Sequence, residues 1–96
     1  MQAYSEAQIK EALTETEGWQ LDPANGEIYR QYVFGNFVES LSFVNKVGEV
    51  AEEMGHHPDI TIKWNKVLLS LGTHDAGGLT DLDFSLARRA NELAQS

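Results

Sequence analysis

All three histidines of the 96-residue chain lie in one segment that also carries acidic residues. His56 and His57 follow Glu52, and His74 comes before Asp83. Histidine is the side chain that both donates and accepts protons near neutral pH. Because imidazoles with different neighbours can differ in proton affinity, one can act as an acid while another acts as a base. The types and spacing of these residues therefore indicate acid–base chemistry.

Three amphipathic helices are expected to surround this segment. Ser5 and Gln8 form a capping box at the start of the first. Apolar residues recur at helical spacing over residues 36–54, which predicts a second and longest helix. Thr80 and Asp83 form another capping box, so a third helix is expected to begin there.

Two hairpins are expected between these helices. Residues 19–21 and 27–34 are separated by a turn sequence, and residues 60–71 alternate well enough for a second pair of strands. The resulting order is α-β-β-α-β-β-α. Three amphipathic helices can cover one face of an antiparallel sheet. We therefore expect an α+β fold with two layers, in which three helices lie on one face of a four-stranded antiparallel sheet, with the strand order left open.

The apolar pattern favours one register for the second hairpin, with Asn65 and Lys66 at its tip. Extended beyond the strands, this register sets His57 opposite His74, with β-carbons ~5 Å apart. Both imidazoles would then project from the polar face of the sheet and could hold one small ligand. The pairings are Ile60 with Leu71, Ile62 with Leu69, and Trp64 with Val67.

The expected core draws on the second hairpin and the second helix. Trp64 is expected to pack there through its pairing with Val67. Phe37, Leu41 and Val44 recur at helical spacing, and we interpret this stripe as core rather than as a cofactor-binding surface.

The composition limits the class of protein. Ninety-six residues with 42% hydrophobic and 23% charged side chains suit one domain, which we expect to span residues 1–96. Seven basic against fifteen acidic residues give a net charge of −8, which disfavours direct binding to nucleic acid or anionic membranes. There is no cysteine, and no apolar run approaches the ~20 residues that span a bilayer. We expect a soluble cytoplasmic protein.

The pattern E-x(3)-H-H-P-x(5)-W-x(9)-H-x(8)-D, starting at Glu52, resembles the signature of the pterin-4a-carbinolamine dehydratases, and T-H-D-A-G-G-L-T at 73–80 adds to the match. This family is also known as dimerisation cofactors of a homeodomain transcription factor. The resemblance covers roughly residues 50–90. It implies dehydration of a 4a-hydroxytetrahydropterin to a quinonoid dihydropterin, in tetrahydrobiopterin-type cofactor recycling, without a metal or an organic cofactor. It also implies a homodimer or homotetramer.

The resemblance further implies roles for individual residues. His56, His57 and His74 correspond to the catalytic set, with Glu52 and Asp83 in support. Which histidine is the acid and which the base stays open. Many relatives have Ser or Thr at position 72, so a hydroxyl contact of the family is missing here. The implied substrate contacts are Gly55, Pro58, Gly72, Thr73 and Asp75.

Two other functions compete with this interpretation. The histidines, with Glu52 or Asp75, could bind zinc, but none of the usual zinc-ligand spacings is present. The chain could instead be a binding module that promotes dimerisation of a protein partner, and nothing in the sequence identifies such a partner. An enzyme and an adaptor could also coexist in one chain.

Overall fold

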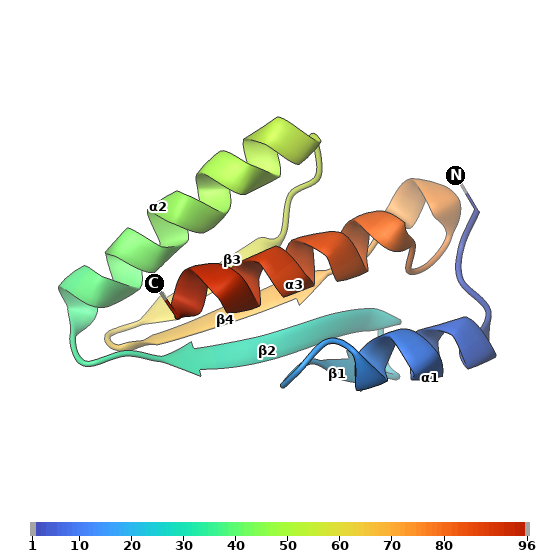
Figure 1. Ribbon diagram of the computed structural model, residues 1–96, viewed down its shortest axis with the longest axis horizontal. Helices are drawn as coiled ribbons and strands as arrows, with labels where there is room; N and C mark the ends of the chain where they lie inside the picture. The colour runs from blue at the N-terminus through green and yellow to red at the C-terminus, as the bar shows by residue number, and fades with distance from the viewer. Residues whose placement is uncertain (1, 96) are drawn as a thin grey trace.

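The computed structural model describes residues 2–95, so residues 1 and 96, the ends of the expected domain, lie outside the described residues. Its elements follow the expected order α-β-β-α-β-β-α, with one short 3₁₀ turn, η1, before the last helix (Figure 1). They are α1 Glu6–Thr14, β1 Gln20–Asp22, β2 Glu27–Val33, α2 Phe37–Met54, β3 Asp59–Lys63, β4 Lys66–Leu71, η1 His74–Ala76 and α3 Asp81–Ala94.

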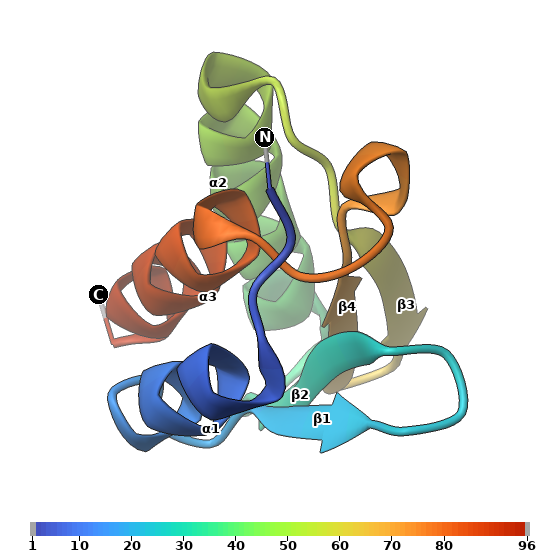
Figure 2. The ribbon, with the colours of Figure 1, turned by 90° about the vertical axis from the view of Figure 1, so that its right-hand side faces the viewer.

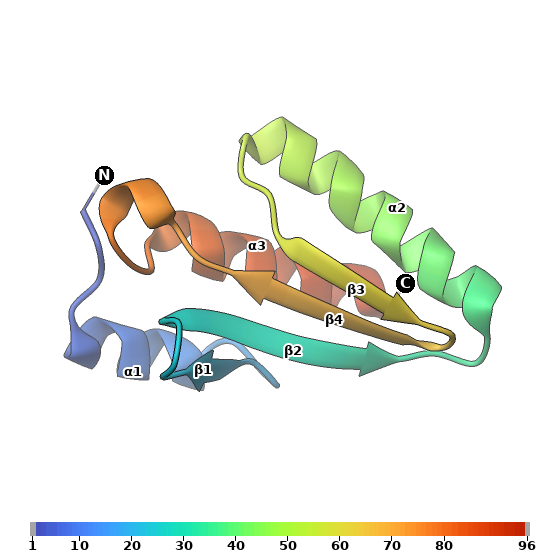
Figure 3. The same cartoon turned by 180° about the vertical axis from the view of Figure 1, so that it is seen from behind.

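The four strands form one antiparallel sheet in the order β1-β2-β4-β3. The two hairpins therefore meet along β2 and β4, which are the central strands. The three helices lie on one side of the sheet (Figure 2), and the view from behind shows the strands in front of them (Figure 3). This confirms the predicted two-layer α+β fold and supplies the strand order that the sequence left open.

The helices begin where their capping residues predict. Both predicted capping boxes are present, with Ser5 and Gln8 at α1 and Thr80 and Asp83 at α3. At the end of α2, Gly55 adopts a left-handed conformation with φ of 65°, which a side chain would disfavour. Among residues 2–95, none of the helices combines the length and apolar character that crossing a bilayer requires.

The core lies between the central strands and the inner faces of α2 and α3. Its strand residues alternate along β2 and β4, as expected where one face of a sheet is covered. Helix α2 contributes an aromatic contact, because the Phe43 ring lies 4.7 Å from that of Tyr32 and 5.0 Å from that of Phe34. The buried apolar strand residues are Ile28, Tyr32, Val67, Leu69 and Leu71.

Asn91 of α3 connects the helix layer to the sheet through its amide oxygen. This oxygen accepts hydrogen bonds from the Tyr32 hydroxyl at 2.5 Å, Trp19 Nε1 at 3.1 Å and Arg30 Nη1 at 2.8 Å. Burial raises the pKa of Tyr32 to about 12, so its hydroxyl stays protonated and can donate. Three donors on one acceptor fix α3 over β2.

The face of α2 that packs against the sheet differs from the predicted one. Phe37 and Leu41 of the predicted core stripe are exposed, at 47% and 39%, and Val44 is half-buried. The buried side chains include Phe43 and Val47 instead. Helix α2 is apolar on two faces. The spacing of its apolar residues therefore predicted the helix correctly, but it could not show which face packs against the sheet. The packed face is the one that carries Phe43, whose ring contacts Tyr32 of β2.

The second hairpin also differs from the predicted register, by two residues. Ile60 pairs with Leu69 and Ile62 with Val67, so the turn is formed by Trp64 and Asn65. Because side chains alternate with a period of two, the shift keeps the β4 residues on their predicted faces, and Val67, Leu69 and Leu71 are buried. On the edge strand β3 the prediction holds less well, because Ile60 is exposed and Ile62 is only half-buried. Trp64 occupies the turn with φ of 51° and is 68% exposed, so the prediction that it packs in the core was wrong.

The turn residue Asn65 explains the shift. The Asn65 carbonyl accepts a hydrogen bond from the Phe34 amide at 2.8 Å, and its side-chain amide donates to the Phe34 carbonyl at 3.0 Å. These bonds attach the turn to the chain just after β2. The position of the turn is therefore set by a contact with the segment that follows β2. Turn preferences of the local sequence cannot predict such a contact.

We expect the two faces of β4 to differ sharply in their contribution to stability. Leu69→Ala should lower the free energy of unfolding by about 2 to 5 kcal/mol, because the side chain is fully buried. Leu68→Ala, the same truncation one residue earlier on the open face, should cost less than about 1 kcal/mol. Urea unfolding followed by circular dichroism measures both, and equal losses would contradict this assignment of faces.

Candidate active site

Each of the three histidines contacts a different carboxylate. The histidines and their carboxylate partners come from the last turn of α2, the link between α2 and β3, the start of β2, η1 and α3. All three contacts are made by Nε2 of the imidazole. The pairs are His56 with Asp83 at 2.6 Å, His57 with Glu52 at 2.5 Å, and His74 with Glu27 at 3.2 Å.

The His56–Asp83 pair is buried. The Asp83 side chain has no exposed surface, and His56 is only 11% exposed. The second carboxylate oxygen of Asp83 accepts hydrogen bonds from the Thr73 hydroxyl at 2.7 Å and the Thr80 backbone amide at 2.9 Å. Asp83 therefore caps α3, as predicted, and also connects the α2–β3 link to the loop that carries His74.

The His57–Glu52 pair is exposed. The His57 side chain is 61% exposed and that of Glu52 78%. The left-handed Gly55 turns the chain back after α2, which returns His57 to the last helical turn. Although Glu52 lies one helical turn before His56, its carboxylate contacts the imidazole of His57.

His74 lies on a short loop with its imidazole 83% exposed. Backbone hydrogen bonds in both directions between Thr73 and Gly78, at 3.2 and 3.3 Å, close this loop around η1. Because β3 begins and β4 ends at the same end of the antiparallel sheet, His57 and His74 lie at that end. The predicted direct opposition of these two histidines is wrong, since the observed register would place Gly72 opposite His57 and neither histidine is in a strand.

Glu27, the carboxylate that contacts His74, was not among the predicted site residues. The β2–β4 register pairs Ile28 with Leu71, which brings Glu27 beside Gly72 and the loop that follows. That neighbourhood depends on the strand order, which the sequence does not reveal. The only local signal is an acidic residue placed directly after the turn between β1 and β2.

A pocket of about 250 Å³ lies beside His74. Of the predicted site residues, it gathers Gly72, Thr73 and His74, whereas Gly55 and Pro58 lie on the α2–β3 link and exposed Asp75 lies on η1. Its lining is Asn25, Gly26, Glu27, Gly72, Thr73, His74, Gly77 and Gly78. Within residues 2–95 no group of three or more His, Cys, Asp or Glu side chains is placed to hold a metal ion.

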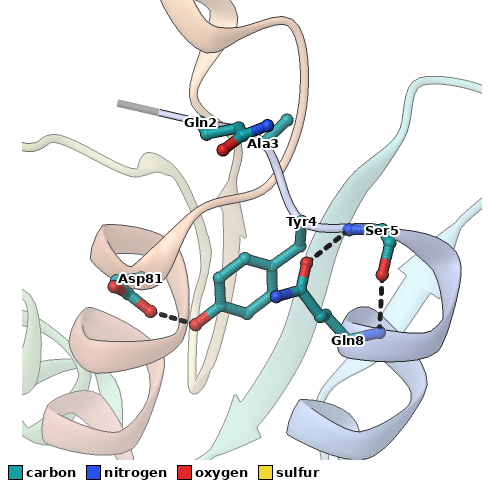
Figure 4. Close-up of a pocket in the computed structure, with 6 residues that line it drawn as sticks. All are labelled: Gln2, Ala3, Tyr4, Ser5, Gln8 and Asp81. Carbon is teal, nitrogen blue, oxygen red and sulfur yellow. Dashed lines mark hydrogen bonds between the residues drawn. The ribbon is translucent and has the colours of Figure 1, made fainter.

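A larger hollow of about 610 Å³ near the N-terminal segment contains no histidine. Figure 4 shows the Tyr4 hydroxyl donating a hydrogen bond to the Asp81 carboxylate, and this bond raises the pKa of Tyr4. The Tyr4 backbone amide donates to the Leu79 carbonyl at 2.7 Å. This region therefore ties the N-terminal segment to the loop after His74, and the acid–base groups lie elsewhere.

Comparisons with known proteins agree with these features. The profile of the family described as pterin 4 alpha carbinolamine dehydratase matches residues 2–93. A candidate pterin-4-alpha-carbinolamine dehydratase of Thermomicrobium roseum is 49% identical, covering 98% of this chain and 99% of the relative. One of Sulfurisphaera tokodaii is 44% identical, covering 97% and 98%.

Two solved structures are similar in fold. The crystal structure of a transcriptional coactivator/pterin dehydratase from Brucella melitensis has a TM-score of 0.93 at 33% identity, covering 96% of this chain and 98% of that one. A pterin dehydratase-like protein described as a RuBisCO assembly factor in the alpha-carboxysome has a TM-score of 0.71 at 22% identity, covering 83% and 93%. With a family profile that matches nearly the whole chain and relatives close to half identical, the protein belongs to the pterin-4a-carbinolamine dehydratase family.

Proposed function

We infer that the protein removes water from a 4a-hydroxytetrahydropterin and releases the quinonoid dihydropterin, as a step in tetrahydrobiopterin-type cofactor recycling. One observation carries this proposal beyond family membership. Two exposed imidazoles, those of His57 and His74, lie at the same end of the sheet and each contacts its own carboxylate. A dehydration needs one acid and one base, which two such imidazoles can supply.

The proposed reaction balances without an oxidant or a reductant. The bond between C4a and its hydroxyl oxygen breaks, and a general acid protonates the departing hydroxyl to give water. A general base takes a ring N–H proton, and the electrons of that bond form the new double bond. Each transfer contributes typically ~10² to 10⁴ in rate. Because no oxidation state changes overall, the reaction needs no redox cofactor, and in this proposal protein side chains supply both the acid and the base.

The three histidines differ in the roles that their surroundings favour. The imidazoles of His57 and His74 are exposed, which favours their direct contact with the pterin. Which of the two is the acid is left open. The third member of the expected catalytic set, His56, is enclosed and bound to Asp83. In this proposal it contributes chiefly by holding the α2–β3 link, and hence His57, in place.

The remaining predicted residues are proposed as substrate contacts at this end of the sheet. Gly72 and Thr73 line the pocket beside His74, where a planar ring could approach their backbone. Gly55 and Pro58 flank the adjacent histidine pair, and Asp75 follows His74 on η1.

Alanine substitutions should distinguish the roles of the three histidines. His57→Ala and His74→Ala should each lower kcat by about 100-fold or more, with stability changed by less than about 0.5 kcal/mol, since both rings are exposed. His56→Ala should cost about 3 to 5 kcal/mol of stability, because it leaves Asp83 buried without its partner. Dehydration kinetics and urea unfolding give the two readouts. Wild-type kcat in His74→Ala would overturn the proposed site.

Chelator treatment should leave the activity unchanged, because the proposed chemistry uses protein side chains alone. Dialysis against EDTA followed by the dehydration assay makes this test, with a buffer-dialysed sample as the control. Activity that is lost on chelation and restored by zinc would instead support the alternative of a zinc site.

A second role, assembly with another protein chain, is favoured by an apolar surface far from the histidines. Val33, Phe37, Val38 and Leu41, at the end of β2 and the start of α2, are all exposed. Exposed apolar clusters of this kind mark association surfaces. We propose that a second copy of this chain covers them, giving the expected homodimer or homotetramer.

Val38→Glu should therefore shift the protein towards the monomer in light scattering at micromolar concentration. Val38 is 72% exposed and is the second residue of α2, where an acidic side chain suits the helix N-terminus. Ala7→Glu is the matched control, because Ala7 is the exposed second residue of α1. Assembly that survives Val38→Glu, or that Ala7→Glu disrupts equally, would contradict this surface.

A further inference from the structure

Glu27 is a nearly buried carboxylate held from two directions. Its Oε1 accepts a hydrogen bond from the Ser70 hydroxyl at 2.7 Å and lies 3.4 Å from the side-chain amide nitrogen of Asn25. Its Oε2 lies 3.2 Å from Nε2 of His74. The Glu27 backbone amide is also fixed, because it donates to the Asn25 side chain at 2.9 Å. Both oxygens thus have defined partners, of which Ser70 is half-buried while Asn25 and His74 are exposed.

The difference in burial within the Glu27–His74 pair indicates what the contact does. The Glu27 side chain is 12% exposed, whereas that of His74 is 83% exposed. Burying a carboxylate costs free energy, and an exposed partner returns little of it. A contact that served stability alone would gain more from an apolar residue at position 27. The arrangement instead resembles the general one in which a fixed carboxylate orients an imidazole.

The backbone beside Glu27 leaves room for this carboxylate. A Cβ atom at Gly72 would lie 2.9 Å from Cγ of Glu27 and 3.4 Å from its Oε2. Gly72 does not have the left-handed backbone conformation that favours glycine. Glycine at position 72 is therefore explained by space, and the space is taken by the Glu27 side chain.

We propose that Glu27 is a positioning residue for His74. Its Oε2 lies 3.2 Å from Nε2 of His74, and the negative carboxylate favours a proton on that nitrogen. The neutral imidazole then takes the Nε2–H tautomer and leaves Nδ1 as the nitrogen that exchanges a proton with the substrate. The inference rests on the proposed dehydratase function for its kinetic consequence. Its structural consequence, the tautomer of His74, can be measured in the protein without substrate.

The first test is the imidazole ¹⁵N spectrum of the wild-type protein at about pH 9, where an ordinary histidine is neutral. The His74 signals are identified by their loss in His74→Ala. We expect His74 as the Nε2–H tautomer in the wild type. In Glu27→Gln, whose amide can donate to Nε2, we expect a shift towards the Nδ1–H tautomer. Predominant Nδ1–H tautomer in the wild type would overturn the proposal, whether or not the protein is an active dehydratase.

The second test is kinetic. Glu27→Gln should lower kcat at least about tenfold with KM changed less than about twofold, because it alters the proton-exchanging nitrogen and not the pocket wall. In the His74→Ala background the same substitution should have no further effect on kcat. Glu11→Gln, on the exposed side of α1, is the matched control and should have wild-type kinetics.

The outcomes distinguish the two proposals. Equal losses of kcat from Glu27→Gln in the wild-type and His74→Ala backgrounds would show a merely structural role for Glu27 and overturn its assignment. A wild-type protein without dehydratase activity would overturn the proposed function, while the tautomer measurement would still decide the role of Glu27.

Discussion

The arrangement of the candidate site depends on one buried charge. Asp83 has no exposed surface, so its carboxylate must be satisfied entirely by protein groups. Its partners are His56, the Thr73 hydroxyl and the backbone amide of Thr80. His56 and Thr73 are the direct chain neighbours of His57 and His74. The requirement to satisfy Asp83 therefore fixes both segments that present an exposed histidine, and it does so at the start of α3.

This difference in burial would let one small domain hold the proposed reactive groups firmly while leaving them accessible. The buried pair bears the cost of desolvation and gains rigidity from its additional hydrogen bonds. The contacts of the exposed imidazoles of His57 and His74 contribute little to stability, as contacts of exposed charged groups generally do. His57 and His74 are thus free to exchange protons with a ligand, because the fold does not depend on their contacts with Glu52 and Glu27.

The sequence predicted well what local patterns determine. Both capping boxes, the element order and the packed face of β4 follow from residue type and spacing, and each was confirmed. What failed depended on contacts between distant elements. The tip of the second hairpin is set by Asn65 bonding to Phe34, and the packed face of α2 by Phe43 meeting Tyr32. Glu27 was missed for the same reason, because only the β2–β4 pairing brings it to His74.

The length of α2 would let the proposed catalytic role and the proposed assembly role occupy separate surfaces. The exposed apolar residues lie at its first turns, whereas Glu52 and His57 lie at its far end. Eighteen helical residues span roughly 27 Å at the usual rise per residue. A partner on the apolar surface would therefore leave the histidines open to a small molecule. The His56–Asp83 contact joins α3 to the link that follows α2, so the histidine end is held by contacts that lie apart from the apolar surface.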